Sequence, residues 1–212
     1  MIQLFGIKKS YGSQPVIDIP EMHLHHHIYW LKGMNGSGKT TLMKLLAGLL
    51  PFQGDVLIDK NISIRKNRVA YLHLVNYAEA EPLLPPFLTG SDLIQLFRKT
   101  KNASQLQVDE LISSFGVSSF INNPLGTYSS GMLKKLSLIL GFIGNAKLIL
   151  LDEPLVTIDD RTVPIVTQLI LDYHNLRGTT FVLTSHQLFD ASAFPDAHQL
   201  LMQDKRVQFL YR

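Results

Sequence analysis

The chain has 212 residues, of which 46% are hydrophobic and 17% charged, a balance typical of one globular domain with a good-sized core. It contains no cysteine, which excludes disulfides and thiolate metal sites and favours a reducing, cytoplasmic setting. The formal net charge is +3 without a run of Lys and Arg, and no stretch approaches the roughly 20 apolar residues that span a bilayer. We therefore expect a single cytoplasmic domain over residues 1–212 that does not bind nucleic acid and reaches a membrane only through a partner.

Short strands are expected at the N-terminus. Residues 2–9 and 14–19 read as strands joined by a turn at Tyr11-Gly-Ser, and a third strand of the same antiparallel sheet is predicted at 25–31. This last segment begins with His25, His26 and His27. Because neighbouring side chains point to opposite faces of a strand, these histidines are not expected to converge on one metal ion.

A glycine-rich segment, Gly33-Met-Asn-Gly-Ser-Gly38-Lys39-Thr40, follows this strand and precedes apolar residues at helical spacing over 41–50. It matches the phosphate-binding loop, in which backbone N–H groups and a helix N-terminus face a phosphate. Lys39 is expected to reach the β- and γ-phosphates, and the Thr40 hydroxyl to ligate Mg²⁺. A glycine-rich turn matching by chance is the alternative, on the order of one in a hundred for this length. The predicted nucleotide contacts of the loop are Asn35, Gly36, Ser37, Gly38, Lys39, Thr40 and Thr41.

The middle of the chain has a different character. Residues 68–72 are predicted as a strand, and a proline-rich bend then leads into helical periodicity over 89–99 and 106–115, with Ser91 or Thr89 as the N-cap. We expect an inserted helical subdomain over about residues 79–130.

Helices and strands alternate in the last third of the chain. Helices are predicted at 131–143 and 161–173, and uninterrupted apolar strands at 148–151 and 180–184. This alternation indicates a parallel sheet covered on both faces. The expected fold class is α/β, a P-loop NTPase with a mostly parallel sheet, an antiparallel β subdomain and an inserted α-helical subdomain.

Two carboxylates, Asp152 and Glu153, directly follow the strand at 148–151. Parallel sheets bind their ligands at the carboxyl ends of the strands. Asp152 is suited to hold Mg²⁺ through water, and Glu153 to orient or deprotonate the attacking water. A core strand that meets a solvated turn is the alternative, but together with the phosphate loop the pair predicts a hydrolysis site.

The segment Tyr128-Ser129-Ser130-Gly131-Met132 opens the helix at 131–143, and an N-cap would suffice to explain it. With the phosphate loop and the Asp-Glu pair in this order, however, the sequence resembles the ATP-binding-cassette ATPases over almost its entire length. The resemblance implies that these five residues correspond to the signature motif, Leu-Ser-Gly-Gly-Gln. It also implies that Ser129 and Gly131 contact the γ-phosphate bound on the other subunit of a dimer.

The same resemblance assigns further residues. Asp159 corresponds to the loop that crosses the dimer interface, although a surface turn explains it equally well. His186, after the strand at 180–184, matches a histidine that contacts the γ-phosphate, which makes Lys39, Glu153 and His186 the expected catalytic set. Tyr11 would stack on adenine with Val16 beside the base, a contact of about 1 kcal/mol, unless it is a core tyrosine.

One residue that the resemblance leads us to expect is absent from the sequence. A glutamine that touches Mg²⁺ and the attacking water should follow the strand predicted at 68–72, but Leu74 occupies the expected position and no Gln occurs up to Phe87. Glu79 or Glu81 could substitute. The departure puts coupling in doubt more than nucleotide binding.

The resemblance implies an ATPase subunit that uses ATP and Mg²⁺, dimerises on ATP and powers a separately encoded permease. It is most similar to bacterial exporters, and residues 77–96 would form the docking face for the permease. A soluble ATPase of this fold that acts on nucleic acid or ribosomes is the first alternative. A regulatory cassette of low activity is the second.

Overall fold

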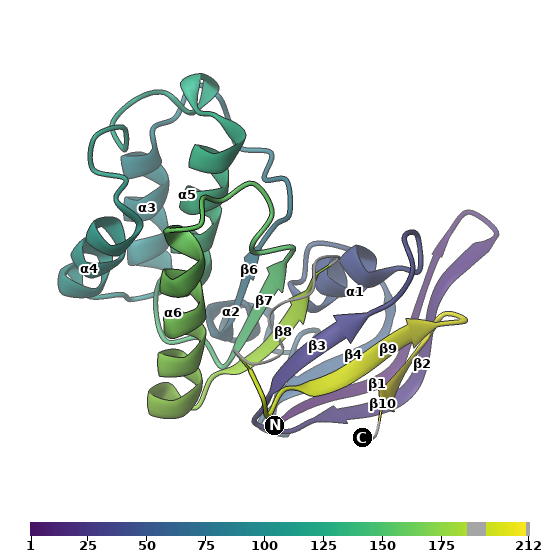
Figure 1. Ribbon diagram of the computed structural model, residues 1–212. Helices are drawn as coiled ribbons and strands as arrows, with labels where there is room; N and C mark the ends of the chain where they lie inside the picture. Colours follow the sequence, from purple (N-terminus) through teal and green to yellow (C-terminus); the bar gives the residue numbers. More distant parts are fainter. Residues whose placement is uncertain (186–193, 211–212) are drawn as a thin grey trace.

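A mostly parallel sheet forms the centre of the molecule. The structure is a computed structural model that describes residues 1–185 and 194–210. In these residues the strand order is β10-β9-β3-β8-β7-β6, and neighbours are parallel except in the β9–β10 hairpin (Figure 1). The strands are β3 (Ile28–Lys32), β6 (Val75–Ala78), β7 (Leu148–Asp152), β8 (Thr180–Thr184), β9 (His198–Gln203) and β10 (Arg206–Leu210). The predicted α/β class is confirmed.

A second, antiparallel sheet has the order β2-β1-β4-β5. Its strands are β1 (Ile2–Tyr11), β2 (Gln14–Leu24), β4 (Gln53–Ile58) and β5 (Ile62–Ser63). The prediction that 25–31 belongs to this sheet is wrong, because β3 pairs with β8 and β9 in the large sheet, and β4 flanks β1 instead. Four consecutive buried residues, Ile28 to Leu31, mark a strand covered on both faces rather than a half-exposed one.

The helices are α1 (Lys39–Leu46), α2 (Arg68–Leu74), α3 (Gly90–Thr100), α4 (Gln105–Phe115), α5 (Ser130–Phe142) and α6 (Thr162–Arg177), with a 3₁₀ turn at Leu125–Thr127. The strand predicted at 68–72 is wrong. These residues form α2, in which Tyr71 alone is fully buried and Val69 is exposed, and the strand begins only at Val75. Helix α1 also stops before the predicted residue 50, because Gly48 turns the chain with a φ of +74°.

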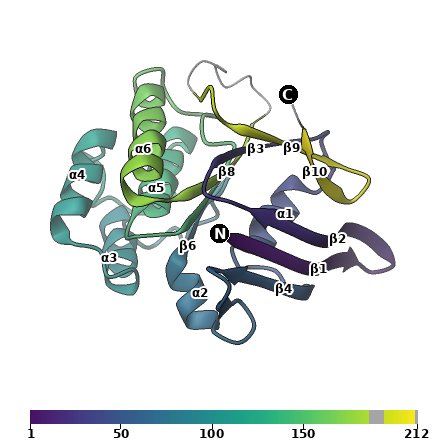
Figure 2. The same ribbon diagram turned by 90° about the horizontal axis from the view of Figure 1, so that it is seen from below.

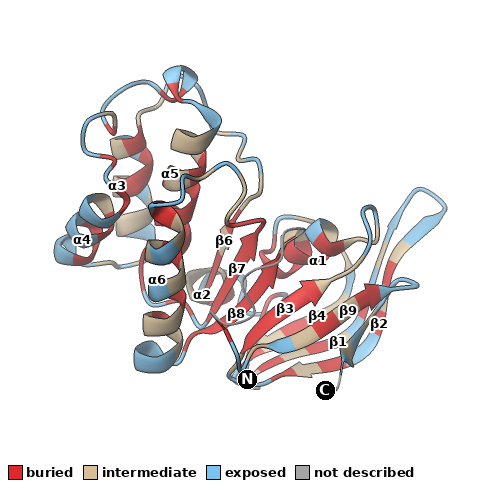
Figure 3. Cartoon of the chain, in the orientation of Figure 1, coloured by how far each residue is buried: buried red, intermediate tan, exposed pale blue. Residues whose placement is uncertain are grey.

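The central strand β7 packs on both sides. Leu148 and Leu150 belong to a hydrophobic cluster shared with α1 and the antiparallel sheet. Ile149 and Leu151 belong to a second cluster, shared with α3 to α6. Figure 3 shows the resulting band of buried residues along β3, β7 and β8. The alternation fixes the register of β7 and therefore where Asp152, at its end, emerges.

Helices α3 and α4 lie to one side of the sheet, beyond α5, in both views (Figures 1 and 2). They occupy the segment expected to be helical. Thr89 is the N-cap of α3, since its hydroxyl accepts from the Asp92 backbone N–H at 3.1 Å and the Asp92 carboxylate accepts from the Thr89 N–H at 2.9 Å. Of the two proposed caps, Thr89 is the one that the structure selects. In the described part of the chain no helix is both long and apolar enough to cross a membrane.

Candidate active site

A pocket of about 530 Å³ opens where β3, β6 and β7 end. Segments far apart in the sequence meet there, and nearly all of the lining residues were predicted from the motifs. The lining consists of Tyr11, Val16, Asn35, Gly36, Gly38, Lys39, Thr40, Thr41, Ala80, Asp152 and Glu153. The phosphate loop, the two carboxylates and the aromatic side chain thus share one cavity.

The loop after β3 is shaped by glycine and by Lys39. Gly38 has a φ of +106°, which disfavours any residue with a Cβ, and it directly precedes the first turn of α1. The buried Lys39 ammonium donates to the Gly33 and Met34 carbonyls at 2.8 and 3.1 Å. Burial lowers the pKa of Lys39, and the nearby Glu153 and Asp152 carboxylates oppose this shift. Backbone N–H groups at a helix start and a cation beside the loop suit a phosphate chain.

The two carboxylates at the end of β7 are held by Thr184 on the neighbouring strand. The Thr184 hydroxyl donates to Asp152 Oδ1 at 2.5 Å and accepts from the Glu153 N–H at 3.0 Å. Tyr77 Oη donates to the other oxygen of Asp152 at 3.2 Å. Glu153 has a φ of +48°, a conformation that costs a non-glycine residue about 1–3 kcal/mol and is concentrated at functional sites.

A buried lysine on α5 also contacts the backbone at the ends of β6 and β7. Lys134 of α5 donates to the carbonyls of Glu79, Ala80 and Asp152 at 2.9, 3.4 and 2.8 Å. Burial lowers its pKa to about 8, against the opposing effect of the Asp152, Glu153 and Glu79 carboxylates. One ammonium therefore ties the ends of β6 and β7 to helix α5.

Comparison with known proteins decides the family. Residues 23–156 match the family model described as ABC transporter. The chain belongs to the ABC transporter family. The cytochrome c biogenesis ATP-binding export protein CcmA of Legionella pneumophila is 33% identical over 189 residues, which are 88% of this chain and 93% of that protein. The lantibiotic transport ATP-binding protein SrtF of Streptococcus pyogenes is 26% identical over 198 residues, 92% of this chain and 84% of that protein.

Solved structures agree on the fold. The ATP-binding subunit of an ABC transporter superposes with a TM-score of 0.86 at 20% identity and covers 99% of this chain and 90% of that one. The ATP-binding cassette MJ0796, in a dimeric post-hydrolysis state bound to ADP and Pi, gives a TM-score of 0.83 at 18% identity with complete coverage of both chains. As a member of the ABC transporter family, this protein is an ATP-binding ATPase, and the pocket at the ends of β3, β6 and β7 is its candidate active site.

The residues assigned to the ABC signature lie outside this pocket. Ser129 is the N-cap of α5, where its hydroxyl accepts from the Met132 N–H at 3.3 Å. A Cβ on Gly131 would come within 2.8 Å of the Thr157 carbonyl, so the loop after β7 packs directly on the helix start. Neither Ser129 nor Gly131 lines the pocket of its own chain. Their contact with a nucleotide on another subunit stays a prediction.

The loop residue Asp159 is engaged within its own chain. Its carboxylate accepts from Lys135 Nζ at 2.6 Å, from the Thr162 hydroxyl at 2.8 Å and from the Thr162 backbone N–H at 2.9 Å. These hydrogen bonds lower the pKa of Asp159 to about 2. The expected role of Asp159 at a dimer interface stays a prediction, and His186 lies outside the described residues. The Ser37 hydroxyl of the phosphate loop is buried without a hydrogen-bond partner among the described residues.

The structure changes the interpretation of the missing glutamine. The glutamine was expected shortly after the strand predicted at 68–72. Since the strand is β6 instead, the positions that follow it are Glu79 and Ala80 rather than Leu74. Leu74 is half-buried against the hydrophobic core, Glu81 is exposed, and the Glu79 carboxylate pairs with Lys44 at 3.7 Å. Ala80, which the sequence analysis did not consider, lines the pocket and offers only a methyl group.

Thr184 was not predicted as a site residue, although one feature of the sequence points to it. It ends the buried strand next to β7, and a parallel register places Asp152 opposite Thr184. A hydroxyl beside a metal-binding carboxylate commonly fixes its orientation.

Thr184→Val is expected to reduce ATP hydrolysis by about 10- to 100-fold, because it removes the partner of both carboxylate residues while keeping the side-chain shape. The free energy of unfolding should fall by about 1–3 kcal/mol, since a buried acceptor and donor lose their bonds. Phosphate release and thermal unfolding measure the two effects. Thr184→Ser keeps the hydroxyl and is the control, and equal losses in both variants would contradict the role of the hydroxyl.

Proposed function

We propose that this ATPase powers export through a separately encoded permease, as one half of an ATP-dependent dimer on the inner face of the membrane. The observation that carries the proposal is an apolar groove beside the active site, described below. The relative CcmA is an ATP-binding export protein, which supports the direction of transport, and the relative SrtF is a lantibiotic transport ATP-binding protein, which supports a role in transport.

The pocket residues suit Mg²⁺ together with ATP. The Thr40 hydroxyl and the Asp152 carboxylate both line the cavity, and oxygen atoms of this kind are the ligands that Mg²⁺ prefers. The ion, when bound, would neutralise charge on the phosphates. Lys39 holds the phosphate chain from the loop side, and Glu153 stands at the end of β7 to orient the attacking water.

The placement of the signature residues supports the proposed dimer. Ser129 and Gly131 begin α5 away from the pocket of their own chain. In the proposed dimer, Ser129 and Gly131 contact the nucleotide bound to the other subunit, and Asp159 lies at the interface between the subunits. Tyr11 and Val16 contact the adenine, and His186 contacts the γ-phosphate. The dimeric MJ0796 cassette is a precedent for pairing of this fold.

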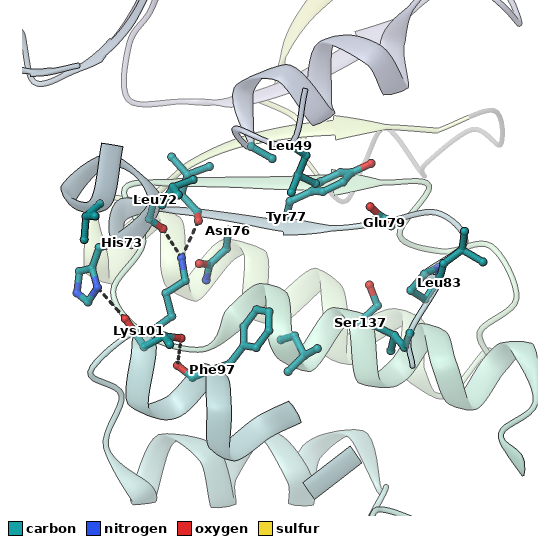
Figure 4. A pocket seen from close by; sticks show the side chains of 17 residues that line it. Leu49, Leu72, His73, Asn76, Tyr77, Glu79, Leu83, Phe97, Lys101 and Ser137 are labelled. Atoms are coloured by element: carbon teal, nitrogen blue, oxygen red, sulfur yellow. Dashed lines mark hydrogen bonds between the residues drawn. The ribbon is translucent and has the colours of Figure 1, made fainter. Parts of the chain in front are cut away.

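The groove lies between the sheet and the helical segment (Figure 4). Its volume is about 540 Å³, and α2, β6, the chain after β6, α3 and α5 contribute to it. Apolar side chains at its rim are strongly exposed, with Leu83 94%, Val69 85% and Leu49 57% accessible. Exposed apolar surface of this kind marks interaction sites. We propose that an apolar cytoplasmic segment of the permease occupies the groove, which lies partly within the docking face expected at residues 77–96.

The proposal is tested by purifying the tagged protein from detergent-solubilised native membranes and identifying what accompanies it. A multi-span membrane protein is expected with the unaltered chain. Leu83→Asp should abolish its recovery, because a charge at the rim must be desolvated when an apolar segment docks.

The matched control is Leu176→Asp, a leucine 81% exposed on α6 and outside the groove. It should leave recovery of the membrane protein unchanged. Recovery of ribosomes or nucleic-acid proteins alone would favour a soluble ATPase. A membrane protein retained by both variants would contradict the groove as its docking site.

A further inference from the structure

Tyr77 connects the groove to the nucleotide pocket. Its ring is one of the walls of the groove, in the view of Figure 4 between Leu49 and Glu79. Its hydroxyl donates to Asp152 Oδ2, which lines the nucleotide pocket, at 3.2 Å. A single side chain on β6 thus contacts the proposed permease site at one end and a predicted Mg²⁺ ligand at the other.

The phenol acts as a hydrogen-bond donor, and its acceptor is Asp152 Oδ2 at 3.2 Å. Since Thr184 holds the other oxygen, the two hydroxyl donors together fix the plane of the Asp152 carboxylate.

The backbone around Tyr77 is tied to the same strand end. Tyr77 pairs with Leu150, and Ala78 with Leu151, in the parallel ladder between β6 and β7. Lys134 then bonds the carbonyls of Glu79 and Asp152 at 2.9 and 2.8 Å. Ala80 offers no polar side-chain atom to the pocket, so the Tyr77 hydroxyl supplies a polar contact from this segment to the metal-binding carboxylate.

We propose that Tyr77 is a positioning residue that transmits occupation of the groove to the Mg²⁺ site. A segment seated in the groove packs against the phenol ring, and the ring sets the orientation of Asp152 through its hydroxyl. In the reverse direction, Mg²⁺ binding at Asp152 changes the groove. The inference rests on the proposed function in one respect, which is that the permease is the partner that occupies the groove.

The test measures both cavities in the isolated chain. Because the sequence has no cysteine, Leu83→Cys creates a single thiol at the groove rim that can carry an environment-sensitive fluorophore. The labelled protein is saturated with a non-hydrolysable ATP analogue and titrated with Mg²⁺. The expected result is a change in groove fluorescence that follows Mg²⁺ binding.

Adding Tyr77→Phe should raise the midpoint Mg²⁺ concentration by about tenfold and remove most of the fluorescence change. Analogue affinity without Mg²⁺ should not change. The matched control is Tyr29→Phe, which removes a hydroxyl that donates to the His25 carbonyl at 3.3 Å, away from both cavities, and which should behave as the parent.

An unchanged midpoint in Tyr77→Phe, or a fluorescence change that persists at full size, would overturn the inference. So would a parent protein whose groove probe does not respond to Mg²⁺. Failure of the permease proposal would instead appear in the Leu83→Asp purification and would leave this titration unaffected.

Discussion

Replacing Glu153 by Gln is expected to lower kcat for ATP hydrolysis by about 10²- to 10⁴-fold while ATP binding stays close to that of the unaltered protein. The amide keeps the size and the hydrogen-bonding reach of the carboxylate but cannot accept a proton from the attacking water. The backbone conformation should also be retained, because the Glu153 N–H remains bonded to the Thr184 hydroxyl.

If the dimer proposal is correct, Glu153→Gln should accumulate as an ATP-bound dimer, visible by light scattering with Mg²⁺ and excess ATP. Glu110→Gln, a change of the same kind at an exposed position of α4, is the control and should hydrolyse ATP normally. A monomer that persists at high ATP would count against the dimer. Undiminished phosphate release would remove Glu153 from the mechanism.

Lys39→Ala is expected to weaken ATP binding by about 10- to 100-fold and to abolish measurable hydrolysis. A hydrogen bond to a charged group contributes about 1.5–3 kcal/mol, and Lys39 is the buried cation that lines the phosphate-binding part of the pocket. Titration with a fluorescent ATP analogue and a phosphate-release assay measure the two losses.

Lys66→Ala, an exposed lysine before α2, is the matched control and should not affect either measurement. Thermal unfolding separates a loss of function from a loss of fold, since the alanine also leaves the Gly33 and Met34 carbonyls without their donor. Equal phosphate release from Lys39→Ala and the unaltered protein would contradict the role of Lys39, and equal release from Glu153→Gln as well would contradict ATP hydrolysis by this protein.

Local signals predicted the chemistry of this chain well. The phosphate loop and the Asp152-Glu153 pair are contiguous motifs, each attached to an apolar strand, and the structure brings them into one pocket. The fold class was predictable for the same reason, because apolar strands alternating with helices admit few arrangements.

The features that the sequence did not predict depend on contacts between segments that are distant in the chain. The run Val69-Ala-Tyr71-Leu reads as a strand, yet it forms a helix whose one buried residue, Tyr71, donates its Oη to the Leu46 carbonyl of α1 at 2.8 Å. That error moved the expected glutamine position to Leu74. The roles of Thr184 and the one proposed for Tyr77 likewise depend on the registers of β7 with β8 and β6, which join distant segments.

The ion pair between Lys135 and Asp159 has a consequence for assembly. It joins the loop after β7 to α5, the helix that begins with the predicted signature residues. The packing of Gly131 on the Thr157 carbonyl is a second contact between the same loop and helix. Three residues assigned to the dimer contact, Ser129, Gly131 and Asp159, are therefore ordered while the chain folds. In the proposed dimer, the conformational entropy of this surface would be lost before two subunits meet, so more of the contact free energy would remain to favour their association.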